Sequence, residues 1–284
     1  MKFGFSLSLH YSDLRSKVLS LENEKKNKFS FCILLAYSYL CSMISKNQIK
    51  YVRQLERKKG RTAEGLFVAE GPKVVGDLIA AGYLPKMVFA IKEWKEKHGD
   101  MDVQEVTEEE LQKVSFLQHP QQVLALFEMP KSVALDKAGK ELCLALDGVQ
   151  DPGNLGTIIR IADWFGIRTI YCSEDTADAW NPKVIQATMG SIARVKMVYT
   201  DLKALIEKAE VPVYGTLLDG QDIYTQPLSK EGIIVMGNEG NGISQEIRKL
   251  ITHRLLIPKY QEGPESLNVA IATAITCSEF RRRL

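Results

Sequence analysis

The sequence predicts an α/β protein in which a small α/β domain precedes a larger domain built on a mostly parallel sheet. From residue 141 onward, short apolar runs alternate with helical patterns, which is typical of a parallel sheet covered by helices. The stretch "KSVALDKAGK", residues 131–140, is polar and loosely patterned, which favours a domain boundary near residues 130–140. With 284 residues the chain is long enough to bury two modest cores.

The composition is that of a soluble globular protein, with 45% hydrophobic and 25% charged residues. The five cysteines include no C-x-x-C pair, which favours reduced thiols and a cytoplasmic location. The four histidines lie far apart and lack metal-ligand spacing, so we predict no metal site. Seven basic residues and one acidic residue gather between Lys46 and Arg61. This basic strip is either a solvated helix face or a set of phosphate contacts.

The first 44 residues do not match the pattern of the rest. The apolar stretch from Phe29 to Ile44 has about 16 residues, fewer than the roughly 20 that a membrane-spanning helix requires. It also lacks the charge order and cleavage site of a signal peptide. We predict that residues 1–44 are an extension dispensable for activity, with Met43 just before the first domain, so we expect no membrane association. A membrane anchor is the alternative.

The first domain is predicted over residues 45–133, followed by a linker over residues 134–140. We expect helices and strands in the segments "IKYVRQLERKKGR" (49–61, helix), "GLFVAEGPKVVGDLIAAG" (65–82, strand, turn and helix) and "PKMVFAI" (85–91, strand). In "TEEELQKVS", Thr107 and Glu110 have the spacing of a capping box, which predicts one more short helix.

The second domain, predicted over residues 141–284, repeats strand and helix. The strands are expected at 141–149, 168–173, 196–200, 211–218, 232–237 and 253–258. The helices are expected at 154–166, 182–193, 201–210, 242–250 and 266–283.

The stretch "VMGNEGNGIS", Val235 to Ser244, places three glycines and two asparagines around one glutamate, directly after a predicted buried strand. Glycine accepts positive φ and lets another group approach the backbone closely. Because open α/β sheets bind ligands at the carboxyl ends of their strands, we predict a binding site in this glycine loop, with a tight turn as the alternative. No P-loop or dinucleotide fingerprint is present, which argues against a nucleotide-dependent dehydrogenase.

Three segments of the second domain form a set: "LDGVQDPGNLGTIIRIADWFG" (146–166), "IVMGNEGNGIS" (234–244) and "IPKYQEGPESLNVAIATAI" (257–275). In this order they resemble the three motifs of the SpoU (TrmH) RNA 2′-O-ribose methyltransferases of the SPOUT superfamily. The upstream stretch "RKKGRTAEGLFVAEGPKVV" is similar to the RNA-binding substrate domain attached to many members. The resemblance covers roughly residues 46–284.

The resemblance implies S-adenosylmethionine as the cofactor and a ribose 2′-hydroxyl group in structured RNA as the methyl acceptor. It implies a knotted catalytic fold, in which the C-terminal helix passes through a loop, as an exception to the rule that chains do not thread their loops. It also implies a homodimer formed through the catalytic domain. The N-terminal domain favours ribosomal RNA over transfer RNA as the substrate.

Carried over residue by residue, the family's catalytic positions fall on Asn154, Arg160, Glu239, Ser266 and Asn268. Its cofactor-binding positions fall on Leu217, Gly237, Ile257 and Leu267. The predicted RNA contacts in the basic strip are Lys58, Lys59 and Arg61. Taken singly, these catalytic residues could be helix caps or a surface ion pair, but together and in this order they favour the catalytic interpretation.

The family's usual proposal makes the arginine the base that removes the hydroxyl proton. Deprotonating an arginine at pH 7 costs about 7.5–9 kcal/mol. We therefore assign Arg160 to binding of RNA phosphate and hydroxyl, for which its planar fork is suited. Ser266 is the expected hydrogen-bond partner of the attacking oxygen. The alternative, a noncatalytic RNA-binding or ribosome-assembly factor, would lack Arg160, Asn268 or the glycine loop, and all three are present.

Overall fold

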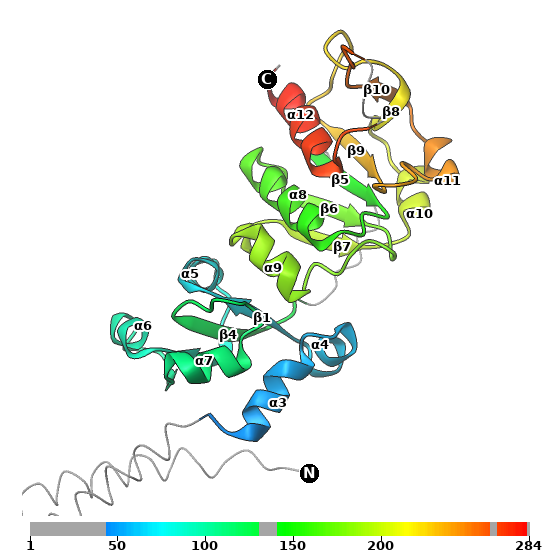
Figure 1. Cartoon of the computed structure of the whole chain (residues 1–284). Coiled ribbons are helices and arrows are strands. Elements are labelled where there is room, and N and C mark those ends of the chain that lie inside the picture. Colours follow the sequence, from blue (N-terminus) through cyan, green and yellow to red (C-terminus); the bar gives the residue numbers. More distant parts are fainter. Residues whose placement is uncertain (1–43, 131–140, 262–265, 283–284) are drawn as a thin grey trace, which may run out of the picture. The chain divides into compact units, whose positions relative to one another are not determined.

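The computed structural model describes residues 44–130, 141–261 and 266–282, which contain two β-sheets with their helices (Figure 1). The expected extension lies outside the described residues except for Ile44. That residue is buried, and its N–H donates to the Glu110 carboxylate at 3.2 Å, so it belongs to the first domain. The predicted linker also lies outside the described residues. Within the described part of the chain, no helix is long and apolar enough to cross a bilayer.

The first sheet is mixed and has the strand order β1, β4, β2, β3. Its central strand β4 runs antiparallel to β1 and β2, whereas β2 and β3 are parallel. Alternate residues of β1 enter different apolar clusters, Phe67 on one face and Val68 on the other. The elements are α3 (Lys46–Gln54), α4 (Lys58–Glu64), β1 (Leu66–Glu70), α5 (Pro72–Ala80), β2 (Pro85–Ala90), α6 (Lys92–Lys97), β3 (Gln104–Glu105), α7 (Glu108–Val114) and β4 (Val123–Glu128).

The helix expected over residues 49–61 forms as two helices, α3 and α4, so the prediction of one helix is wrong. The Arg61 guanidinium donates hydrogen bonds to the carbonyl oxygens of Leu55 and Glu56, at 2.8 and 2.6 Å, and so satisfies groups beyond the end of α3. A Cβ at Gly60 would overlap the last carbonyl group of α3, so glycine permits this close return of the chain.

Other local predictions for this domain are confirmed. The segment 65–82 forms β1 and α5, and β2 forms where expected. The capping box exists, because the Thr107 hydroxyl accepts from the Glu110 N–H at 3.2 Å and the Glu110 carboxylate accepts from the Thr107 N–H at 3.0 Å. Helix α6 was not predicted, because its only buried residue, Trp94, leaves no apolar periodicity to detect.

The second sheet has six parallel strands in the order β10, β8, β9, β5, β6, β7. This confirms the predicted α/β class with a parallel sheet. The elements are β5 (Leu142–Asp147), α8 (Pro152–Trp164), β6 (Thr169–Cys172), α9 (Pro182–Thr188), a 3₁₀ turn (Ser191–Ala193), β7 (Lys196–Tyr199), α10 (Leu202–Glu207), β8 (Val213–Asp222), β9 (Gly232–Gly237), α11 (Gln245–Arg248), β10 (His253–Leu256) and α12 (Val269–Arg282).

Strand β5 is the position at which the chain changes the direction in which it adds strands to the sheet. The next two strands, β6 and β7, are added on one side of β5, and the last three lie on its other side with β9 as the neighbour. Asp147 at the end of β5 is paired in register with Gly237 at the end of β9. The loops that follow these strands therefore leave the sheet side by side at its carboxyl edge, where open α/β sheets bind ligands.

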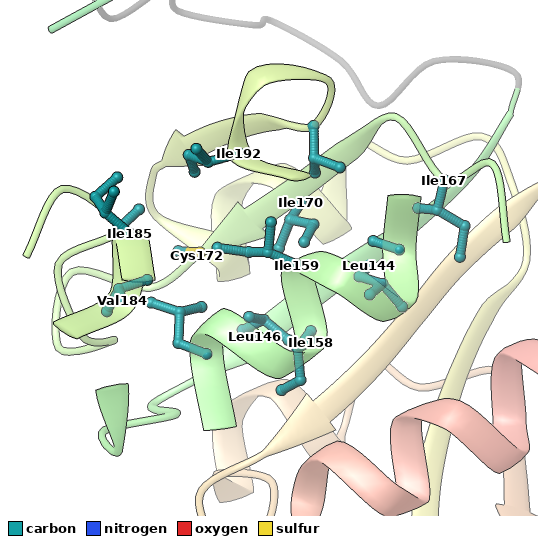
Figure 2. Close-up of a cluster of buried hydrophobic side chains, with 14 of the residues drawn as sticks. Leu144, Leu146, Ile158, Ile159, Ile167, Ile170, Cys172, Val184, Ile185 and Ile192 are labelled. Atoms are coloured by element: carbon teal, nitrogen blue, oxygen red, sulfur yellow. The ribbon is translucent and has the colours of Figure 1, made fainter. Parts of the chain in front are cut away.

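Helices cover both faces of this sheet. Leu144 and Leu146 of β5 enter a cluster with α8, α9 and α12, whereas Cys143 and Ala145 enter a cluster with α10 and α11. Figure 2 shows the first cluster, in which Leu144 and Leu146 lie with Ile158 of α8. Full burial of one such leucine or isoleucine contributes about 1.5–3 kcal/mol. This packing holds α8 on the strands whose ends carry the candidate site.

Several expected helices are shorter than predicted, and α9 and α11 are shortened most. The helix expected over residues 182–193 ends at Thr188, because Met189 and Gly190 adopt positive φ values of 51° and 95°. A 3₁₀ turn follows. The helix expected over residues 242–250 is reduced to the four residues of α11, since the preceding residues belong to the folded glycine loop.

Candidate active site

The loop between β5 and α8 brings polar groups to the carboxyl edge. Gly148 follows the strand with a φ of +75°, which glycine adopts without strain. Asp151 caps α8, because its Oδ1 accepts a hydrogen bond from the Asn154 N–H at 2.7 Å. Pro152 occupies the first turn, where no N–H is needed. Asp151 is thus the cap of α8, and the Asn154 side chain is left for other contacts.

The glycine loop closes on itself. Asn238 and Gly242 exchange two backbone hydrogen bonds, at 2.9 and 3.0 Å, and the Asn238 Oδ1 accepts another from the Gly240 N–H at 2.9 Å. The Asn238 Nδ2 donates to the Gly148 carbonyl at 2.7 Å, which ties this loop to the loop after β5. A Cβ at Gly237 would overlap the Gly242 backbone. The closed form of the loop therefore requires glycine at this position, whether or not a ligand binds.

Glu239 extends from the glycine loop to the start of α8. Its Oε1 accepts hydrogen bonds from the Asn154 Nδ2 at 3.0 Å and the Asp151 N–H at 3.3 Å, and its Oε2 accepts one from the Gln150 N–H at 3.3 Å. Burial raises the pKa of the Glu239 carboxyl, but the hydrogen bonds together outweigh burial and hold the pKa below its ordinary value. The group is therefore an ionised acceptor that joins two motif segments.

Asn268 joins the third motif segment to the same network. Its Oδ1 accepts the N–H groups of Ala270 and Ile271, at 2.9 and 3.3 Å, and so caps α12. Its Nδ2 donates to the Asn154 Oδ1 at 2.9 Å. Backbone donors at one end and the Glu239 carboxylate at the other end determine which way both amides point. The three motif segments thus meet in one chain of hydrogen bonds.

Arg160 and Ser266 are exposed and lie outside this network. Arg160 projects from α8 and has no hydrogen bond or ion pair with any residue of the described segments. Its guanidinium therefore offers all of its donors to a ligand. Ser266 directly precedes Leu267 and follows residues 262–265, which lie outside the described residues.

Strand β8 is not the simple strand that the sequence predicts. Its pairing with β10 shifts, so that residues 216–220 leave the ladder and form an excursion near the end of the sheet. Asp219 in this excursion forms ion pairs with Arg248 and, at 3.2 Å, with Arg254. Leu217, one of the predicted cofactor contacts, lies in the same excursion and is buried.

The other predicted cofactor contacts lie at the ends of neighbouring elements. Gly237 ends β9, Ile257 follows β10 and is partly buried against the core, and Leu267 precedes α12 and is half exposed. Strands β9, β8 and β10 are adjacent in the sheet. The chain thus supplies apolar side chains and loop backbone groups at this edge, a lining that suits a flat, uncharged ring.

The predicted RNA contacts divide into two kinds. Lys58 and Lys59 are exposed on α4, and within the described segments neither forms an ion pair. Arg61 is 1% exposed and its guanidinium binds Asp178, so the expectation that Arg61 contacts RNA is wrong. Its donors are directed to protein acceptors. Nothing in the local sequence distinguishes Arg61 from its basic neighbours, since its acceptor lies 117 residues away.

A separate cavity of about 370 Å³ opens at the same edge towards β6 and β7, and none of the predicted residues lines it. Its lining includes the carboxylates of Asp147, Glu174, Asp201 and Glu246 and one amine, that of Lys203. The excess of negative charge disfavours an RNA phosphate there. The candidate site therefore rests on the hydrogen-bonded network and its neighbouring strand ends.

Two family profiles match this chain. The SpoU rRNA Methylase family matches residues 141–278, and the MRM3-like substrate binding domain matches residues 46–125. The chain is also 34% identical over 246 residues to the 23S rRNA (guanosine(2553)-2′-O)-methyltransferase RlmP of Bacillus subtilis. That alignment covers 84% of this chain and 97% of RlmP.

Two solved structures are similar to both domains. An RNA methyltransferase structure assigned to the TrmH family, from Porphyromonas gingivalis, has a TM-score of 0.78 at 43% identity and covers 85% of this chain and 100% of its own. The AdoMet-bound rRNA methyltransferase from Sinorhizobium meliloti has a TM-score of 0.77 at 32% identity and covers 85% of this chain and 97% of its own.

Proposed function

The chain belongs to the SpoU rRNA methylase family, and we propose that it methylates a ribose 2′-hydroxyl group of ribosomal RNA with S-adenosylmethionine as the donor. The observation that carries this proposal is the hydrogen-bonded chain from Glu239 through Asn154 to Asn268, which joins the three motif segments. The name of the relative RlmP supports ribosomal RNA as substrate, and the AdoMet-bound neighbour supports the cofactor.

We assign the adenosine portion of the cofactor to the edge formed by Leu217, Gly237, Ile257 and Leu267. Three of these residues offer apolar side chains, and none of the four is charged, which fits an adenine ring better than a phosphate. When bound, the cofactor supplies a methyl group activated by its sulfonium. In the described segments no three His, Cys, Asp or Glu side chains gather as metal ligands do. We expect calorimetry to find cofactor binding unchanged by a chelator.

The reaction forms a bond between the ribose 2′-oxygen and the methyl carbon, breaks the bond between that carbon and sulfur, and releases the hydroxyl proton. We assign Arg160 to the neighbouring RNA phosphate and to the 2′-oxygen, where a fixed positive charge stabilises developing negative charge. Ser266 is assigned to a hydrogen bond with the attacking oxygen. Glu239, Asn154 and Asn268 hold the loops that bring these groups together.

We assign residues 45–133 to RNA binding, residues 134–140 to the linker and residues 141–284 to catalysis. The match of residues 46–125 to a substrate binding domain supports this division. Lys58 and Lys59, exposed and without ion pairs in the described segments, are the proposed phosphate contacts. A cytoplasmic location agrees with a ribosomal substrate and with the free thiols of the described cysteines, Cys143, Cys172 and Cys277.

We further propose a homodimer that covers exposed apolar side chains of α8 and α12. Trp164 on α8 is 85% exposed and Ile271 on α12 is 52% exposed, and the two helices pack against each other. Exposed large apolar groups on adjacent helices favour an interface, and twofold symmetry is the commonest arrangement. Arg160 lies on α8 as well, so the partner subunit would lie near the candidate site.

The path of the chain after β10 supports the proposed knot. Strand β10 is at the edge of the sheet, yet α12 packs against α8 and β9 near the middle. Between β10 and α12 the chain therefore passes from the edge of the sheet to its middle. We propose that α12 threads a loop, as the family resemblance implies.

The proposed function is tested with purified protein, S-adenosylmethionine and ribosomal RNA from cells that lack the gene. We expect one ribose in that RNA to gain about 14 mass units, because a methyl group replaces the hydroxyl proton. Mass spectrometry of nuclease fragments measures this gain. RNA from cells that carry the gene is the control and is expected to accept no further methyl group at that position. Tight RNA binding without any methyl transfer would favour the noncatalytic alternative.

A further inference from the structure

Arg61 is a buried guanidinium at the contact between the two domains. Its Nε donates to the Asp178 Oδ2 at 3.2 Å, and a terminal nitrogen pairs with the same oxygen. Its other terminal nitrogen holds the carbonyl groups of Leu55 and Glu56. One side chain thus closes the turn between α3 and α4 and binds the segment between β6 and α9. A lysine could not make these contacts together, because it lacks the planar fork.

The acceptor is held as firmly as the donor. The Asp178 Oδ1 accepts a hydrogen bond from the Trp180 N–H at 3.0 Å, and the Tyr199 hydroxyl accepts one from the Ala179 N–H at 2.8 Å. The Trp180 ring lies 4.8 Å from the Phe67 ring of β1, centroid to centroid. A polar and an aromatic contact therefore join the first domain to the same short segment.

A second contact lies at the other end of α9. The Arg194 guanidinium is 3.5 Å from the Asp77 carboxylate of α5 and also binds Asp163 at the end of α8, at 2.8 Å. A Cβ at Gly190 would overlap Asp77, so glycine allows this approach. The first domain is thus held at two separate points, which restricts rotation about either one.

Helix α9 lies between the contacts with the first domain and packs directly against α8. A Cβ at Gly156 of α8 would overlap the Ala187 side chain of α9, so the two helices are in close contact through a glycine. Lys58 and Lys59 lie within one turn of Arg61 on α4, and Arg160 lies one turn beyond Gly156 on α8. Packed elements connect the basic residues to the candidate site.

We propose that Arg61 is a positioning residue, whose ion pair with Asp178 holds Lys58 and Lys59 at a fixed place relative to Arg160 and so sets which ribose of the bound RNA reaches the site. This inference rests on the proposed function. The buried arginine of the basic strip thus determines where the bound RNA lies relative to the site, although Arg61 itself does not contact the RNA. Misplacement of a substrate by about 1 Å can cost about a hundredfold in rate.

The test uses Asp178→Asn in the full chain. Asparagine retains the shape and an oxygen for the Trp180 N–H but removes the charge that pairs with Arg61. Arg61→Lys is the second variant, in case the first does not fold. Lys86→Ala, which removes an exposed ion pair with Glu128 within the first domain, is the matched control. For each protein the rate at saturating ribosomal RNA, the RNA affinity, the cofactor affinity and the melting temperature are measured.

A positioning role predicts a rate at saturating RNA that falls by about 10- to 100-fold in Asp178→Asn, with RNA and cofactor affinity within about twofold of the parent. Arg61→Lys should act in the same direction and Lys86→Ala should have no effect. A wild-type rate in a folded Asp178→Asn variant would overturn the proposal. So would equal losses of rate and cofactor affinity, which indicate general loss of structure.

A physical measurement separates this inference from the proposed function. Spin labels at Lys59→Cys and Ser278→Cys, in a chain with Cys32 and Cys41 replaced by serine and mixed with an excess of unlabelled chain, report the distance between α4 and α12 within one subunit. We expect one narrow distance distribution in the parent and a broad one with Asp178→Asn. If the parent methylates no RNA, the proposed function fails, while the label distances still test whether the Arg61–Asp178 ion pair positions the first domain. Narrow distance distributions in both proteins would refute that positioning role.

Discussion

The Asn268 side chain donates a hydrogen bond to the Asn154 side chain at 2.9 Å, although the two residues are 114 positions apart in the chain. This contact lies at the start of both α8 and α12. At the other end of the same helices, the Arg281 Nε donates to the Phe165 carbonyl at 2.7 Å and complements the negative end of the α8 dipole. The helix that carries Arg160 is thus held to α12 at both ends.

Asn154→Ala removes both side-chain hydrogen bonds of Asn154, to Glu239 and to Asn268. We expect methyl transfer to fall by at least about tenfold and the free energy of unfolding to fall by about 1–3 kcal/mol, since each of the two bonds contributes about 0.5–1.5 kcal/mol. Initial rates and chemical denaturation measure the two effects. Thr157→Ala, which removes one local hydrogen bond on the same helix, is the control. Unchanged activity in Asn154→Ala would show that methyl transfer does not depend on this hydrogen-bonded network.

The hydrogen bonds that lower the pKa of Glu239 predict a dependence of stability on pH. A carboxyl group with a lower pKa in the folded state stabilises the protein fully above its unfolded value, near 4.5, and loses this contribution as pH falls through the folded value. In Glu239→Gln we therefore expect less loss of stability than in the parent below pH 4.5. Denaturation at several pH values measures this. Parallel curves for the two proteins would contradict the assignment.

Arg160→Ala should separate catalysis from cofactor binding. We expect methyl transfer to fall by at least about a hundredfold, which corresponds to about 3 kcal/mol of transition-state stabilisation. Cofactor affinity should not change, because the proposed adenosine contacts come from β8, β9, β10 and the start of α12. Arg168→Ala, an exposed arginine at the opposite end of the sheet, is the matched control. A wild-type rate in Arg160→Ala would end the active-site assignment.

The basic strip is tested by Lys58→Ala with Lys59→Ala, leaving the buried Arg61 in place. We expect weaker RNA binding and a salt dependence whose slope falls by about two, because each lysine that contacts a phosphate contributes about one. Saturating RNA should restore most of the rate. Binding titrations at several salt concentrations measure the slope, with Lys196→Ala and Lys208→Ala as a control of equal charge. Equal effects of the two double variants would make the strip a solvated helix face.

Trp164→Glu tests the proposed dimer, because a charge placed in an apolar interface opposes association. We expect light scattering to report a dimer for the parent and a monomer for the variant at micromolar concentration, with loss of methyl transfer. Leu84→Glu changes an equally exposed side chain of the first domain and should leave the dimer intact. A monomeric parent with full activity would contradict the proposal.

Local patterns in the sequence were sufficient for much of the fold. Strand β9 forms over the predicted residues 232–237, because its glycine boundaries and apolar run are all contained within six positions. The capping box of Thr107 and Glu110 formed as predicted for the same reason, since its partners are three residues apart. The motif resemblance also identified the three segments that the structure joins.

Only the tertiary structure decided which polar residues contact one another and which are buried. Asn154 resembled a helix cap, but Asp151 caps α8 and Asn154 binds Glu239 and Asn268. Arg61 resembled the exposed lysines beside it, yet it is buried because Asp178, 117 residues later, supplies the opposite charge. Periodicity and capping act over one or two turns, whereas burial of a charge depends on an acceptor that only the folded chain brings near.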